Sequence, residues 1–205
     1  ALDIAYLLPV PGMTITAPKD GTEMIGLLKS AVDWTEGPFS IRWPRDVVPA
    51  PVPPVAEILP VEYGTWEILR EGHDIAILAT GTMVLPALEA AKRLEREGID
   101  ATVVNCRFVK PLDEACLRRL FPAHGAVLTV EEGTVVNGFG AFARARIADA
   151  WPQVRGASMG MPDAFVTHGE RAELLAEIGL TAEGIAERVL ETFGAAIPHS
   201  YRASA

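Results

Sequence analysis

Two closely spaced arginines at the end of a predicted strand are the residues best suited to bind an anion. Within residues 37–46, apolar Phe39, Ile41 and Trp43 alternate with Ser40 and Arg42, the period of a β-strand. Pro44 cannot donate a ladder hydrogen bond, so the strand should end there and leave Arg45 just beyond its carboxyl end. Ligands bind at that end of parallel α/β sheets, and a guanidinium binds phosphate or carboxylate bidentately. Alternatively, Arg42 and Arg45 are surface charges that flank Trp43 or stack on it.

A second candidate is a glycine pattern over residues 138–143 that matches a dinucleotide-binding loop, with alanine in the final position. Glu131 and Glu132 separate these glycines from the preceding predicted strand and would repel a phosphate. A tight turn and close helix packing are the other explanation of the glycines. Adjacent carboxylates on an extended segment point in opposite directions, which makes them a poor acid–base pair. We expect them to cap the following helix or to contact another subunit.

The remaining reactive side chains form no recognisable site. Four histidines are far apart and have no cysteine neighbours, so no metal site is predicted: His73, His124, His168 and His199. There is no G-x-S-x-G and no nucleophile–base arrangement. The residues alone therefore predict no metal site and no self-contained catalytic machinery.

The elements that must position Arg45 are a strand over residues 13–18, a helix over 20–34 and the strand that Pro44 ends. Asp20 is suited to cap the helix, with Glu23 three positions on as in a capping box. Strand, helix and strand form a right-handed parallel crossover by default. Two strands are too few to be stable alone, and the chain starts inside an apolar pattern without methionine. We therefore expect residues 1–46 to be the end of a domain that begins upstream.

Five prolines in residues 47–60 predict an extended, semi-rigid linker. In residues 61–195, strand-like and helix-like segments alternate, which predicts a complete α/β domain with a mostly parallel sheet. We expect residues 196–205 to be a tail.

Composition narrows the classes of function. The chain has 205 residues, 49% of them hydrophobic, and a formal net charge of −9. The negative charge argues against a nucleic-acid or anionic-membrane surface, and no apolar run is long enough to cross a bilayer. Cys106 and Cys116 are isolated, which favours buried thiols in a reducing compartment, and the cytoplasm fits best.

Several phrases together resemble one enzyme family, 1-deoxy-D-xylulose-5-phosphate synthase. R-W-P-R at residues 42–45 is similar to that family's R-Y-P-R-G, and R-F-V-K-P-L-D at 107–113 matches its counterpart. The resemblance also rests on D-I-A-Y-L at 3–7, G-P at 37–38, V-E-E-G at 130–133 and G-M-P-D-x-F-x-x-H-G at 160–169. It extends to about residue 193. Departures are Trp43 for tyrosine, Asp46 for glycine and Leu8 for a basic residue.

The resemblance implies a transketolase-like, thiamine diphosphate-dependent homodimer that condenses pyruvate with D-glyceraldehyde 3-phosphate, the first step of the non-mevalonate isoprenoid pathway. This chain would supply the end of the pyrimidine-binding domain and a whole transketolase C-terminal-like domain. Thiamine diphosphate and Mg²⁺ would be held by upstream residues, so the resemblance implies no catalytic, cofactor-binding or metal-binding residue in this chain. The resemblance assigns Arg45, and less strongly Arg42, to the acceptor phosphate. Alternatives are transketolase, a pyruvate dehydrogenase beta subunit, or a non-catalytic dimerisation module.

Overall fold

The computed structural model describes residues 2–48 and 51–195, so the expected tail and His199 lie outside the described residues. The helices are α1 (Asp3–Leu7), α2 (Gly21–Asp33), α3 (Val84–Arg96), α4 (Glu114–Leu120), α5 (Phe139–Ala150), α6 (Arg171–Glu177) and α7 (Ala182–Phe193). The strands are β1 (Thr14–Thr16), β2 (Phe39–Ile41), β3 (Glu67–Arg70), β4 (Ile75–Ala79), β5 (Ala101–Asn105), β6 (Phe108–Lys110), β7 (Ala126–Thr134) and β8 (Arg155–Met161).

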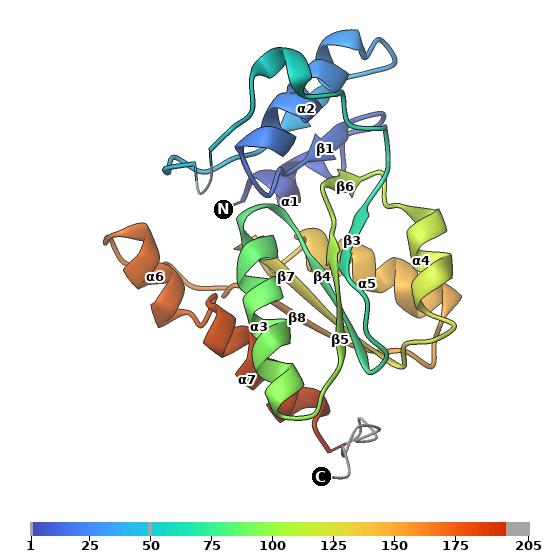
Figure 1. Ribbon diagram of the computed structural model, residues 1–205, viewed down its shortest axis with the longest axis vertical. Coiled ribbons are helices and arrows are strands. Elements are labelled where there is room, and N and C mark those ends of the chain that lie inside the picture. Colours follow the sequence, from blue (N-terminus) through green and yellow to red (C-terminus); the bar gives the residue numbers. More distant parts are fainter. Residues whose placement is uncertain (1, 49–50, 196–205) are drawn as a thin grey trace.

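A five-stranded sheet in the order β3-β5-β4-β7-β8 forms the centre of the molecule (Figure 1). Only β3 runs antiparallel to its neighbour; the other pairs are parallel. Strand β4 is buried along its whole length, as expected for a strand covered by helices on both faces. One apolar cluster joins the sheet to α3 and α7, and a second joins it to α4 and α5. The predicted α/β fold with a mostly parallel sheet is confirmed.

A second, three-stranded sheet has the order β2-β1-β6. The predicted parallel pairing of β1 with β2 is confirmed, and β6 adds an antiparallel strand on the other side of β1. Strands β1 and β2 precede the proline-rich segment and β6 follows it, so this sheet contains strands from both sides of that segment. The second apolar cluster crosses the same boundary, since Ile15 and Leu27 belong to it together with Trp66 and Phe108.

Helix α2 begins as the sequence predicts. The Asp20 side chain accepts a hydrogen bond from the Glu23 amide at 2.8 Å, and the Glu23 carboxylate accepts one from the Lys19 amide at 2.7 Å. On the far side of α2, the Lys29 ammonium donates to the carbonyls of Val55 at 2.6 Å and Ile58 at 2.5 Å. The described part of the proline-rich segment is therefore attached to α2.

Candidate functional site

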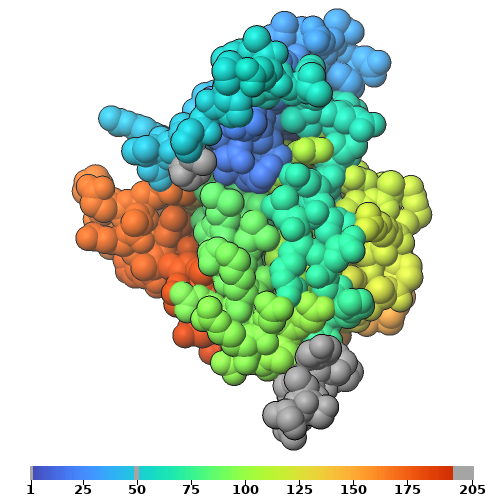
Figure 2. Space-filling model, viewed as in Figure 1, coloured from blue at the N-terminus to red at the C-terminus, as the bar shows by residue number. Residues whose placement is uncertain are grey.

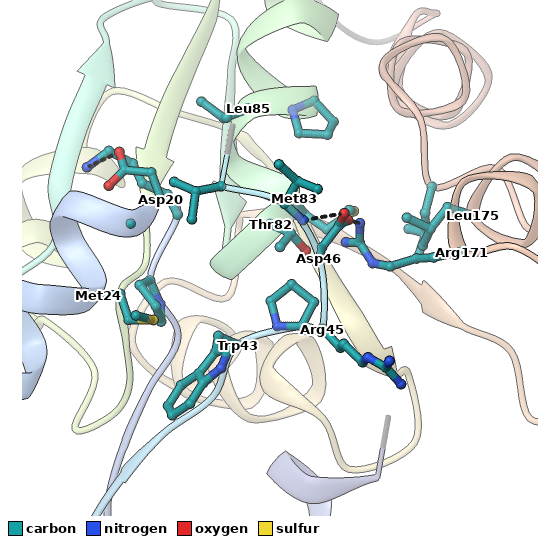
Figure 3. A pocket seen from close by; sticks show the side chains of 18 residues that line it. Asp20, Met24, Trp43, Arg45, Asp46, Thr82, Met83, Leu85, Arg171 and Leu175 are labelled. Carbon is teal, nitrogen blue, oxygen red and sulfur yellow. Dashed lines mark hydrogen bonds and ion pairs between the residues drawn. The ribbon is translucent and has the colours of Figure 1, made fainter. Parts of the chain in front are cut away.

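Arg45 lies in the loop that follows β2 and lines a cleft of about 540 Å³ between this loop, α2, α3 and α6 (Figure 3). Its side chain is exposed, and no described residue forms a hydrogen bond or ion pair with it. In Figure 3, Arg45 and Trp43 leave the loop in different directions. The guanidinium of Arg45 therefore has its hydrogen-bond donors available for a ligand.

Arg42, the second predicted phosphate ligand, is already engaged. Its Nε donates to the Asp3 carboxylate at 2.5 Å, and its Nη2 donates to the backbone carbonyl of Glu132. Burial raises the pKa of Asp3, but the charge of Arg42 outweighs it together with other contacts, and the pKa falls below its usual value. Arg42 thus links β2 to α1 and β7, and of the two arginines Arg45 is the more available for a phosphate.

Glu131 caps α5, as expected for one of the two adjacent carboxylates. It is 1% exposed, and its two oxygens accept hydrogen bonds from the amides of Phe139 at 2.9 Å and Gly140 at 2.7 Å. Burial raises the pKa of Glu131 to about 7, although the two amides act to lower it. A buried carboxylate thus occupies the helix terminus that a phosphate would otherwise use.

The glycine pattern at residues 138–140 is explained by this packing. A Cβ atom on Gly138 would lie 2.6 Å from a carboxylate oxygen of Glu131, and one on Gly140 would lie 2.7 Å from the Ser158 hydroxyl oxygen. A pyrophosphate would have to displace the buried carboxylate. The geometry therefore favours close helix packing over dinucleotide binding.

Glu132 points away from Glu131 and belongs to an ion-pair bridge that the sequence did not indicate. Arg171 of α6 donates through Nε to Glu132 at 2.8 Å and through Nη2 to the other oxygen of the same carboxylate. Its Nη1 donates to Asp46 at 2.6 Å (Figure 3). We call Asp46, Arg171 and Glu132 the Arg171 bridge. It connects the Arg45 loop, α6 and the end of β7, and Arg171 lines a second cleft of about 720 Å³ as well.

The described histidines and cysteines add no further site. His124 is buried, with Nδ1 2.8 Å from the Leu120 carbonyl, and His73 contacts Asp100 on the surface. Cys106 is buried and Cys116 is partly buried; both are free thiols. Within residues 2–48 and 51–195, no three His, Cys, Asp or Glu side chains are grouped to hold a metal ion. No helix in the same ranges is long and apolar enough to cross a membrane.

Comparison with known proteins places this arrangement in a class. The family model of the transketolase C-terminal domain matches residues 64–185, and the chain belongs to that family. The structure resembles a chain described as "Split gene transketolase, inactive beta4 tetramer", with a TM-score of 0.85 and 34% identity over 94% of this chain and 62% of that one. Its fold also matches a transketolase mutant from Pichia stipitis, with a TM-score of 0.71, 23% identity, and 98% and 29% coverage.

Sequence similarity to curated proteins indicates one enzyme within this class. The chain is 44% identical over 93% of its length to 1-deoxy-D-xylulose-5-phosphate synthase of Gloeobacter violaceus, and 43% identical over 96% to 1-deoxy-D-xylulose-5-phosphate synthase 1 of Geobacter sulfurreducens. The predicted resemblance to this synthase is confirmed. The chain spans only 30% and 31% of the length of these two relatives.

Proposed function

We propose that this chain is the C-terminal part of a transferase that condenses pyruvate with D-glyceraldehyde 3-phosphate. The products would be 1-deoxy-D-xylulose 5-phosphate and CO₂, in the first step of the non-mevalonate isoprenoid pathway. The observation that carries the proposal is Arg45, an arginine without a described partner that lines a cleft at the carboxyl end of a parallel strand. Identity of 42–44% to synthases of this name supports the choice of reaction.

In this proposal, Arg45 binds the phosphate of the acceptor aldehyde. A guanidinium offers paired donors that match two phosphate oxygens, and its charge persists across the physiological pH range. Pro44 restricts the backbone directly before Arg45, which reduces the conformational entropy lost when the phosphate is bound. Arg42 is a weaker second candidate because Asp3 and the Glu132 carbonyl already accept its hydrogen bonds.

The proposed enzyme depends on thiamine diphosphate and Mg²⁺, which would supply carbanion chemistry at the thiazolium. The described residues do not fit either group. They include no cluster of metal ligands, and Glu131 occupies the amides at the start of α5. We therefore assign the cofactor to upstream polypeptide and derive no chemical step from this chain beyond binding of the acceptor.

The same proposal includes the domain organisation of the chain and the assembly of the enzyme. We assign residues 1–46 to the end of a pyrimidine-binding domain, 47–60 to a linker and 61–195 to a transketolase C-terminal-like domain. The upstream part of the enzyme would complete the first of these domains, and the assembled enzyme would be a cytoplasmic homodimer. The chain covers only 30% and 31% of the length of two relatives, which supports an upstream part of the enzyme as its partner.

A non-catalytic assembly module is the second candidate for the chain by itself. The observation that favours it is the structural neighbour, a split-gene transketolase that is described as an inactive beta4 tetramer. Light scattering tests this candidate: self-association at micromolar concentration supports it, and a monomer at every concentration contradicts it.

The test of the proposed reaction is the substrate preference of the assembled enzyme, supplied with thiamine diphosphate and Mg²⁺. We expect CO₂ release from pyruvate and a pentulose phosphate product when D-glyceraldehyde 3-phosphate is the acceptor. Two-carbon transfer from a ketose phosphate, without use of pyruvate, would instead identify a transketolase. Acyl transfer from pyruvate to a lipoyl group would identify a pyruvate dehydrogenase. Either result would overturn the proposal.

A further inference from the structure

The loop that carries Arg45 has few attachments to the rest of the molecule. The last backbone hydrogen bond at the end of β2 runs from the Arg42 amide to the Thr16 carbonyl at 2.9 Å. From Trp43 to Val48, no backbone–backbone hydrogen bond joins the loop to any other described residue. The loop must therefore take its position from side-chain contacts, since its backbone is not part of a sheet or helix.

Asp46, directly after Arg45, makes the polar contact that fixes this loop. One carboxylate oxygen accepts a hydrogen bond from the Val47 amide at 2.7 Å, which shapes the turn itself. The other accepts from Arg171 Nη1 at 2.6 Å, across 125 positions of sequence. Both oxygens of Asp46 are thus used, one within the loop and one toward α6 (Figure 3).

Arg171 is itself held in place from the other side. The two carboxylate oxygens of Glu132 accept hydrogen bonds from Nε and Nη2 of Arg171. Oε2 of Glu132 also accepts one from the Thr82 hydroxyl at 2.5 Å. The Glu132 side chain is only 12% exposed, at the carboxyl end of β7. A bidentate pair with a mostly buried carboxylate holds a guanidinium in one orientation. The central sheet therefore fixes Arg171, and Arg171 fixes the loop.

We propose that Arg171 is a positioning residue for the acceptor phosphate, which holds Asp46 and thereby keeps Arg45 at the cleft. This inference rests on the proposed function, because it assumes that Arg45 binds the phosphate. Arg171 is less available to the phosphate than Arg45, because Glu132 and Asp46 accept hydrogen bonds from three of its five N–H donors, whereas those of Arg45 have no described partner. Helix α6 lies at the edge of the molecule in Figure 2. Through Arg171, the position of this helix would affect the geometry of the proposed phosphate site.

The first test uses steady-state kinetics of the assembled enzyme with Arg171→Gln. We expect the KM for D-glyceraldehyde 3-phosphate to rise about tenfold, the cost of a misplaced contact, with kcat within about twofold. The KM for unphosphorylated D-glyceraldehyde should not change. Arg171→Lys, which keeps one charged contact, should recover part of the loss. The matched control is Arg146→Gln, which removes another bidentate pair, to Glu114 at 2.7 and 2.8 Å on α4, and should change neither KM.

A second readout does not depend on activity. Trypsin cleaves after arginine when the chain is free to enter its active site, so the cleavage rate after Arg45 reports how firmly the loop is held. We expect Arg171→Gln to increase that rate at least severalfold and Arg146→Gln to leave it unchanged. Asp46→Ala should raise the KM as Arg171→Gln does, and the double variant should be no worse than either single variant because both break one contact.

The outcomes separate this inference from the function on which it rests. If Arg45→Ala weakens use of the phosphorylated acceptor but Arg171→Gln changes neither KM nor cleavage, the positioning role is wrong and the proposed function stands. Additive losses in the double variant would also overturn the positioning role. If neither Arg45→Ala nor Arg171→Gln affects the acceptor, the phosphate site itself is wrong. Should Arg171→Gln fail to fold, Asp46→Ala on the exposed loop provides the same kinetic comparison.

Discussion

The two arginines of the R-W-P-R segment differ in what surrounds them. Pro44 separates them: Arg42 remains beside the end of β2 and pairs with Asp3, whereas Arg45 lies beyond it and has no described partner. The sequence indicated this difference, because proline ends strand pairing. It did not indicate Arg171, since 125 positions separate Arg171 from Asp46 and no local pattern connects them.

The role of Arg45 is tested by Arg45→Ala in the assembled enzyme. Loss of a charge-assisted contact should cost about 1.5–3 kcal/mol, which lowers kcat/KM for D-glyceraldehyde 3-phosphate roughly 10- to 150-fold. Turnover of unphosphorylated glyceraldehyde should change little. Arg118→Ala, at an exposed arginine of α4, is the control. Equal kinetics of Arg45→Ala and the unaltered enzyme with the phosphorylated acceptor would remove Arg45 from the site.

Glu131 predicts a pH dependence of stability. Its pKa of about 7 in the folded chain lies above the ordinary value of 4.5, because burial outweighs the two amides and nearby Arg42. The folded chain therefore binds the Glu131 proton more tightly than the unfolded chain does. This contribution to the free energy of unfolding is complete below pH 4.5 and is lost as the pH rises to about 7, a change of about 3 kcal/mol. The difference in unfolding free energy between the unaltered chain and Glu131→Gln, measured by denaturant at pH 4.5 to 8, should fall by that amount. A constant difference would contradict this account.

At the scale of elements, the bounds of α2 were predictable from the sequence and the pairing of the short strand β6 was not. Asp20 and Glu23 place the start of α2 because capping is a local interaction. Strand β6 has only three residues, and its partner β1 lies more than 90 positions away. Such pairing depends on the tertiary fold, so the local pattern around Phe108 gave no sign of it.

The N-cap of α2 gives a test at this scale. Asp20→Ala removes the acceptor for the Glu23 amide and should lower the free energy of unfolding by about 1 kcal/mol. The control is Asp33→Ala at the last, exposed turn of the same helix, where an acidic side chain is not favoured by the helix dipole. We expect that change to lie within about 0.5 kcal/mol of zero in denaturant unfolding. Equal losses in the two variants would show that the cap contributes nothing specific.

At the scale of the whole molecule, the three-stranded sheet and the second apolar cluster each contain residues from both of the domains that were predicted from the sequence. Phe108 of β6 is fully buried, and its ring packs against those of Phe39 and Tyr63, with centroids 6.4 and 5.4 Å apart. The proline-rich composition of residues 47–60 predicts extended chain, whereas its described part includes a short 3-10 helix at Val55–Glu57; composition alone also carries no information about what that chain packs on. Lys29 and α2 supply that contact.

Phe108→Ala tests whether the two parts are coupled. Removing this ring should lower the free energy of unfolding by about 3–5 kcal/mol. Because rings from both sides of the prolines pack on it, we expect the fluorescence of Trp34 and Trp66 to change in the same denaturant transition. Single-tryptophan variants separate the two signals. Two transitions, with only one shifted by Phe108→Ala, would show that the parts unfold independently.

The central claim is that this chain supplies the acceptor-binding part of a pyruvate-condensing enzyme whose cofactor site lies upstream. The most direct measurement is formation of 1-deoxy-D-xylulose 5-phosphate from pyruvate and D-glyceraldehyde 3-phosphate, with thiamine diphosphate and Mg²⁺, by this chain with and without the upstream polypeptide. The account predicts product only when both are present. Product from this chain alone, or no product from the assembled enzyme, would contradict it.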